Sequence, residues 1–253
     1  MTEADWLACR QPAPMLDALG DLASPRKRRL FACACCRRLE APLPHLWLRA
    51  ALDVAERFAD GHVSNDELRD AWRRVGEDLH TAHRRIEIET RSGPRPPKDV
   101  RASALLEAQY SALRELSTAV AVSISRSGLG QDAVRAVQSA AQTAALRTAI
   151  GDWQVRAAAS DAGCAEELAQ AELVRDLFTD RFWFVVPDPV WFTPDVLALA
   201  NYIYNDHAFE QMPILADALQ DAGCESGRVL DHCRGPGPHA RGCWVVDLVL
   251  GKE

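Results

Sequence analysis

Apolar residues recur at the spacing of an α-helix along most of this chain. One stretch carries them at positions i, i+4, i+7 and i+11, namely Leu48, Leu52, Ala55 and Ala59. This spacing places the side chains on one helix face, and Gly61 just beyond them is a common type of helix end. No long set of strand patterns interrupts the helical spacing. The sequence therefore predicts an all-α fold, a multi-helix bundle in which helices bury their apolar faces against one another.

Three short motifs predict where helices begin. Ser24 and Thr193 are each followed by proline, the combination of an N-cap residue and a proline at the first helical position. Ser64-Asn-Asp-Glu67 has the pattern of a capping box, so a long helix is expected from Asn65 onward.

Proline and glycine clusters suggest how the chain is divided. Arg91-Ser-Gly-Pro-Arg-Pro-Pro97 separates a predicted N-terminal helical bundle, residues 1–92, from a predicted long helical hairpin, residues 99–180, that turns at Gly128-Leu-Gly130. Residues 181–253 begin with an aromatic, proline-punctuated segment that predicts extended chain, and short helices are expected after it, the last from about Gly242 to Leu250. This third region either stands alone or continues the domain of the hairpin.

Composition narrows the class of protein. The 253 residues carry 29 basic and 36 acidic side chains, a net charge of −7, which argues against a general nucleic-acid binder. No apolar run approaches the roughly 20 residues that span a bilayer, and the N-terminus lacks the pattern of a signal peptide. We therefore expect a cytoplasmic protein with reduced cysteines. A chain of this length forms a sufficient hydrophobic core without disulfides or a bound metal, so we also expect it to fold without a metal.

Two groups of potential ligands are expected to be structural. Cys33, Cys35 and Cys36 lie in an apolar stretch, and residues two apart on a helix point in different directions, which favours core packing over metal binding. Glu77, His80 and His83 follow the spacing of helical metal sites, but no second element of the same kind is evident.

The most informative segment runs from Asp231 to Gly251, and Gly235-Pro-Gly-Pro238 begins a corner within it, residues 235–243. Prolines fix the backbone and glycines permit tight turns, so the side chains that follow are presented at defined positions. In the first interpretation, Arg234 and Arg241 tie the turn to acids such as Asp231 or Asp247, while the residues after Gly242 pack inward.

Two other interpretations give the corner a function. An anion or other small ligand would be held by five candidate binding residues: Arg234, His239, Arg241, Cys243 and Trp244. In a related form, Cys243 is a nucleophile with His239 as its base. A metal would instead be held by His232, Cys233, His239 and Cys243, although adjacent residues on a helix diverge by about 100°.

The two ends of the chain resemble a large family of uncharacterised planctomycete proteins. The resemblance rests on Met1-Thr-Glu-Ala-Asp-Trp-Leu-Ala-Cys9 and Arg29-Leu-Phe-Ala-Cys-Ala-Cys-Cys-Arg-Arg38 near the start, and on His232-Cys-Arg-Gly-Pro-Gly-Pro-His-Ala-Arg-Gly-Cys-Trp-Val-Val-Asp-Leu-Val-Leu-Gly-Lys252 at the end. Residues 213–234 also resemble the short helical repeat-companion domains of the same bacteria. Neither resemblance implies an activity or a set of catalytic residues.

From these observations we expect a non-catalytic protein-interaction or scaffold module that has no cofactor and whose partner is another protein, not nucleic acid or a membrane. The alternative is a small-anion or ligand-binding protein, or a thiol enzyme, that uses the His239, Arg241 and Cys243 corner. An interaction module would expose an apolar patch or groove, whereas a ligand site would be concave with converging polar groups.

Overall fold

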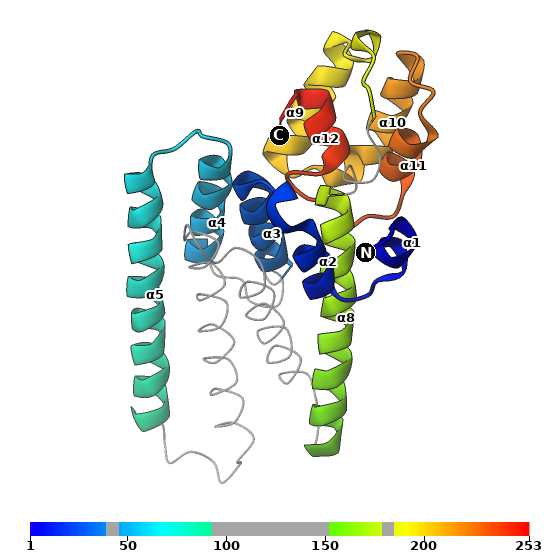
Figure 1. The fold of residues 1–253 in the computed structure, drawn as a ribbon. Helices are drawn as coiled ribbons and strands as arrows, with labels where there is room; N and C mark the ends of the chain where they lie inside the picture. Colours follow the sequence, from blue (N-terminus) through cyan, green and yellow to red (C-terminus); the bar gives the residue numbers. More distant parts are fainter. Residues whose placement is uncertain (39–45, 93–151, 179–184, 253) are drawn as a thin grey trace.

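The computed structural model describes residues 1–38, 46–92, 152–178 and 185–252 (Figure 1). Within these ranges the regular structure is helical and there is no β-strand, so the predicted all-α class is confirmed. None of the described helices is both long enough and apolar enough to cross a membrane.

The N-terminal half contains α1 (Glu3–Ala8), α2 (Pro12–Leu19), η1 (Gly20–Leu22), α3 (Pro25–Arg37), α4 (Leu46–Ala59) and α5 (Asn65–Ser92). After the long helix α8 (Asp152–Phe178) come η3 (Pro189–Trp191), α9 (Pro194–Asp206), η4 (Phe209–Gln211), α10 (Met212–Asp221), α11 (Gly227–Arg234) and α12 (Trp244–Leu250). The turn of the predicted hairpin at Gly128-Leu-Gly130 lies outside the described residues, and α8 occupies the later part of that hairpin's range.

The predicted helix starts are present. The hydroxyl of Ser24 accepts a hydrogen bond from the Lys27 N–H at 3.2 Å, and that of Thr193 accepts one from the Val196 N–H at 3.3 Å. At the start of α5, the Glu67 N–H donates to the Ser64 hydroxyl, and the Ser64 N–H donates to the Glu67 carboxylate at 2.8 Å. These bonds satisfy backbone donors that the helix itself leaves unpaired.

Two hydrophobic cores organise the molecule. The first joins buried residues of α1 to α5 with the last two turns of α8, and it includes Cys33, Cys35 and Cys36, each fully buried as predicted. The second is built from α9, α10, α11 and α12, which Figure 1 shows gathered at the C-terminal end of α8. The corner crosses from one core to the other, because Ala240 packs in the first while Cys243 and Trp244 pack in the second.

Candidate functional site

Gly242 fixes the path of the corner against α3. Its φ angle is +94°, a conformation that side-chain-bearing residues rarely adopt. A Cβ atom at this position would lie 2.8 Å from Cδ1 of Leu30, so the backbone approaches α3 more closely than any other residue would allow. The side chains on either side of Gly242 are consequently held at fixed places between the two cores.

Four side chains converge where the corner meets α8 and α11. Asp176 on α8, His232 on α11, and His239 and Cys243 in the corner each offer one potential ligand atom, and these atoms all lie within 4.8 Å of one another. Nε2 of His232 is 3.1 Å from Oδ1 of Asp176 and 3.1 Å from Sγ of Cys243. Nδ1 of His239 is 2.8 Å from the same Oδ1.

Asp176 is at the centre of this cluster and is almost fully buried. Its second oxygen accepts a hydrogen bond from the backbone N–H of Ala240 at 2.9 Å, which joins α8 to the corner. Burial alone would raise the pKa of Asp176, but hydrogen bonds from His232 and His239 outweigh it and lower the pKa below the ordinary value. The carboxylate form is therefore favoured.

Cys243 is fully buried, which bears on the predicted thiol chemistry. Burial, and then the charge of Asp176, raise the pKa of the Cys243 thiol well above its ordinary value. An activated nucleophile needs a lowered pKa and access to a substrate. The free thiol of Cys243 meets neither requirement, because its pKa is raised and its side chain is fully buried.

A second polar cluster surrounds Arg241. This side chain is only 7% exposed and donates two hydrogen bonds to Oδ2 of Asp60, the residue directly after α4, at 2.7 and 3.1 Å. Asp60 also accepts from the phenol of Tyr204 on α9 and from Arg26 on α3. This is the arrangement expected of a structural tie, with Asp60 in place of the predicted acids Asp231 or Asp247.

Asp247 serves a different pair of cations. It binds the guanidinium of Arg26 through both oxygens, at 2.7 and 2.9 Å, and the ammonium of Lys27 at 2.8 Å. Lys27 also donates to the carbonyl oxygens of Leu177 and Gly242. The start of α3 is thereby fastened to α8, the corner and α12.

The structure does not bring all of the predicted binding residues together. Arg234 is exposed at the end of α11 and pairs with Asp217 and Gln220 of α10, whereas Arg241 binds Asp60. The two arginines that could have supplied the counter-charges of an anion therefore lie at different places. The last helix begins at Trp244 instead of Gly242, with the buried Cys243 as its N-cap.

The alternative metal set also needs one correction. His232, His239 and Cys243 belong to the cluster, but Cys233 is fully buried in the second core, because neighbours on a helix point in different directions. Asp176 takes the fourth place. One feature of the sequence could have pointed to Asp176: it is an acidic residue within an apolar stretch of helix. A charge buried at such a position needs a partner.

The Glu77, His80 and His83 pattern forms no described cluster. Glu77 pairs with Arg73 on the exposed surface of α5, and His80 is exposed. The side chain of His83 lies outside the described residues.

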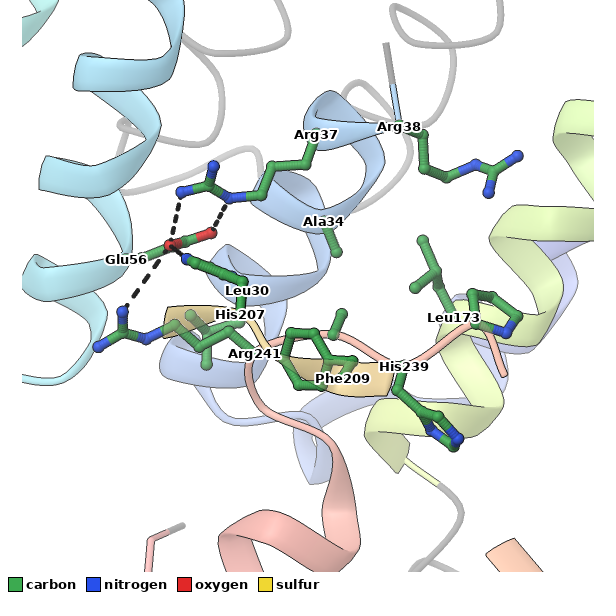
Figure 2. Close-up of a pocket in the computed structure, with 12 residues that line it drawn as sticks. Leu30, Ala34, Arg37, Arg38, Glu56, Leu173, His207, Phe209, His239 and Arg241 are labelled. Atoms are coloured by element: carbon green, nitrogen blue, oxygen red, sulfur yellow. Dashed lines mark hydrogen bonds and ion pairs between the residues drawn. The ribbon is translucent and has the colours of Figure 1, made fainter. Parts of the chain in front are cut away.

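A cavity of about 260 Å³ lies between α3, α8 and the corner (Figure 2). Figure 2 shows Arg37, His207 and Arg241 around the carboxylate of Glu56, with bonds of 2.6 Å from Arg37 and 3.2 Å from Nε2 of His207. Asp53, Glu56 and His207 also place possible ligand atoms within 4.8 Å of one another, but the guanidinium of Arg37 binds both acids. The Arg37 guanidinium thus already supplies the positive charge that a metal ion would bring to these acids.

Comparisons of this chain with protein-family models, with curated proteins and with solved structures found no match.

Proposed function

We propose that this protein binds a transition-metal ion of the zinc class at Asp176, His232, His239 and Cys243. The observation that carries the proposal is the convergence of four ligand atoms, from two helices and the corner, within 4.8 Å of one another. Zn–N bonds of about 2.1 Å and Zn–S bonds of about 2.3 Å place neighbouring ligand atoms of a tetrahedral ion about 3.3–3.6 Å apart. Three separations in the cluster, of 2.8, 3.1 and 3.1 Å, are slightly shorter than this, and all the ligand atoms lie within 4.8 Å of one another.

Hydrogen bonding alone leaves the cluster incompletely satisfied. A ring nitrogen carries at most one hydrogen, so Nε2 of His232 has to share it between the carboxylate and the thiol sulfur, each 3.1 Å away. Oδ1 of Asp176 also lies 2.8 Å from Nδ1 of His239, so one carboxylate oxygen meets two imidazole nitrogens at once. A shared ion is one way in which such a group is satisfied.

The ligand types favour zinc over magnesium or calcium. Imidazole nitrogen and thiolate sulfur suit zinc and related transition metals, while magnesium and calcium select oxygen ligands. Metal binding requires the Cys243 thiol to lose its proton, which a coordinated ion promotes even where burial opposes ionisation.

The predicted scaffold role is supported less well by this geometry than a ligand-binding role. The criterion that separates the two is a concave site with converging polar groups, and the Asp176 cluster and its neighbouring cavity have these properties. An interaction with another protein stays a prediction.

Metal analysis of the purified full-length protein tests the proposal. After zinc loading and removal of excess ion, we expect close to one zinc per chain, and Co²⁺ in its place should give a thiolate-to-metal charge-transfer band. Cys243→Ser should abolish that band, and His232→Ala should lower zinc content. Cys233→Ala is the matched control, because Cys233 is buried beside His232 but lies outside the cluster.

Substoichiometric zinc in the wild-type protein would contradict the proposal. So would a charge-transfer band that persists in Cys243→Ser and disappears in Cys233→Ala.

A further inference from the structure

The cavity of about 260 Å³ in Figure 2 has walls from both hydrophobic cores. Leu30 and Ala34 on α3 and Leu173 on α8 belong to the first core, while Phe209 in η4 packs against the second. Of the four proposed metal ligands, only His239 is among the lining residues. The cavity is therefore a second candidate site, and a molecule in it would contact both cores.

The ionisable side chains of the wall are already paired. Each has an ionisable partner at 2.6–3.2 Å within the described part of the chain, in the pairs Arg37–Glu56, His207–Glu56, Arg38–Glu166, His239–Asp176 and Arg241–Asp60. A charged ligand would have to break one of these pairs or lie without a partner, and burying an unpaired charge is costly. The pairing therefore favours an uncharged ligand.

The surface that faces the cavity is mainly apolar, and its apolar residues are Leu30, Ala34, Leu173, Phe209, Pro238 and Ala240. The cavity is partly open to solvent, so a molecule can enter from outside. Replacing water on such a surface by an apolar molecule is favourable. An apolar cavity of about 150 Å³ holds benzene, so the larger volume here suits one aromatic ring with a substituent.

Two features of the wall favour an aromatic ligand over an aliphatic one. Phe209 supplies an aromatic side chain, and aromatic pairs gain energy beyond the area that they bury. Arg37 and Arg38 also line the cavity, and a guanidinium group attracts the face of an aromatic ring, as Arg241 does with Tyr204 at 4.4 Å.

We propose that this cavity binds a small uncharged aromatic molecule, with a single ring and a short substituent, between the two cores. The ring would be enclosed by the apolar wall, and the paired charges would exclude ionised molecules of the same size. The proposal does not depend on metal binding.

Isothermal titration calorimetry of the full-length protein near neutral pH compares probes of nearly the same size. Benzyl alcohol should bind along a saturable curve with one site per chain. Benzoate and benzylammonium should each bind at least about tenfold more weakly, because either one brings an unpaired charge into the cavity. Cyclohexylmethanol should bind about threefold more weakly or worse, because it has no aromatic face.

Ala34→Leu tests the location of the site. Leucine keeps the high helix propensity of alanine but fills part of the cavity, so the dissociation constant for benzyl alcohol should rise about tenfold or more. Ala198→Leu is the matched control, because Ala198 is exposed on α9 and does not line the cavity. Phe209→Ala removes a wall residue from a different element and should also weaken binding. Melting transitions show which variants are folded.

The wild-type measurements alone can overturn the proposal. A titration with benzyl alcohol that shows no saturable binding overturns the site. Equal affinities for benzyl alcohol and benzoate refute the uncharged class, and equal affinities for benzyl alcohol and cyclohexylmethanol refute the aromatic one. Unchanged affinity in folded Ala34→Leu or folded Phe209→Ala would place the binding elsewhere. None of these results bears on metal uptake, so the two proposals are tested separately.

Discussion

The guanidinium of Arg241 lies 4.4 Å from the centre of the Tyr204 ring, and both side chains bind the carboxylate of Asp60. The three residues come from the corner, from α9 and from the turn directly after α4, which are far apart in sequence. Stacking of a guanidinium on an aromatic face adds to the ion pair when both groups are shielded from water. The contact therefore holds the corner, and the ligands it carries, against the N-terminal core.

Replacing Arg241 should destabilise the protein. Arg241→Ala leaves the Asp60 carboxylate, whose side chain is fully buried, without one of its cations, and removing one partner of a buried ion pair typically costs about 3–5 kcal/mol. Arg234→Ala removes an exposed pair and should cost no more than about 1 kcal/mol. Denaturant unfolding measures both values. Equal stability of Arg241→Ala and the wild type would contradict the structural role of Arg241.

The same network predicts a loss of stability in acid. Burial acts to raise the pKa of Asp60, but hydrogen bonds from Tyr204, Arg26 and Arg241 lower it below the ordinary value. The unfolded chain therefore takes up this proton first as the pH falls. The contribution of Asp60 is present above the unfolded pKa, about 3.9, and is lost as the pH falls through the lower folded pKa.

Unfolding free energies measured from pH 6 downward should show a steeper acid loss in the wild type than in Asp60→Asn, wherever the variant remains folded. Asp66→Asn is the control, because Asp66 pairs only with Arg69 at the exposed start of α5. Identical pH profiles for the wild type and Asp60→Asn would be incompatible with the lowered pKa.

Zinc should stabilise the folded protein through the Asp176 cluster. An ion that binds only the folded state at a free concentration of 100 times its dissociation constant adds about 2.7 kcal/mol. Thermal melting with zinc and with a chelator should differ for the wild type, and the difference should vanish in His232→Ala. His80→Ala, on the exposed face of α5, should keep the zinc response. A zinc response that survives in His232→Ala would place the ion elsewhere.

Two glycines with positive φ angles offer a matched test of the corner. Gly242→Ala places a methyl group against Leu30 and strains the backbone, so we expect a loss of about 1–3 kcal/mol or more. Gly251→Ala strains the backbone at φ +62° but meets no atom within 4 Å, and its loss should be smaller. Chemical denaturation of both variants decides the point. A smaller loss at Gly242 than at Gly251 would be inconsistent with close packing on α3.

Thiol labelling tests the burial of the cysteines. Cys164 is exposed, whereas Cys33, Cys35, Cys36, Cys224, Cys233 and Cys243 are buried. A thiol reagent should modify Cys164 rapidly in the native protein, and Cys164→Ser should remove this fast phase. Rapid modification of several buried cysteines would contradict the packing of both cores.

The sequence was a good guide to features decided by neighbouring residues. The caps at Ser24, Ser64 and Thr193 were predictable because a cap is formed within one helical turn. The sequence also identified His239 and Arg241 as side chains with a defined place, since the Gly/Pro turn constrains them locally.

Partners brought together by tertiary packing were not predictable in the same way. Asp176 precedes His239 by 63 positions, and Asp60 precedes Arg241 by 181, so no local spacing reveals either pair. Arg241 was expected to bind a nearby acid, but the fold brings it to Asp60, directly after α4. Arg234 lies apart from the other candidate binding residues because it is in the last turn of α11 and bonds Asp217 of α10.

The four side chains of the Asp176 cluster belong to different bodies of packed residues: α8 carries Asp176 into the first core, while α11 and α12 belong to the second. An ion held by all four is bound only when the two cores are docked, so docking and ion affinity are thermodynamically reciprocal. A change that loosens the docking, even at the distant Arg26–Asp247 pair, should weaken ion binding in proportion to the fraction of molecules that become undocked, because only the docked state holds the ion. The measured affinity for the ion would then report how firmly the two cores are docked.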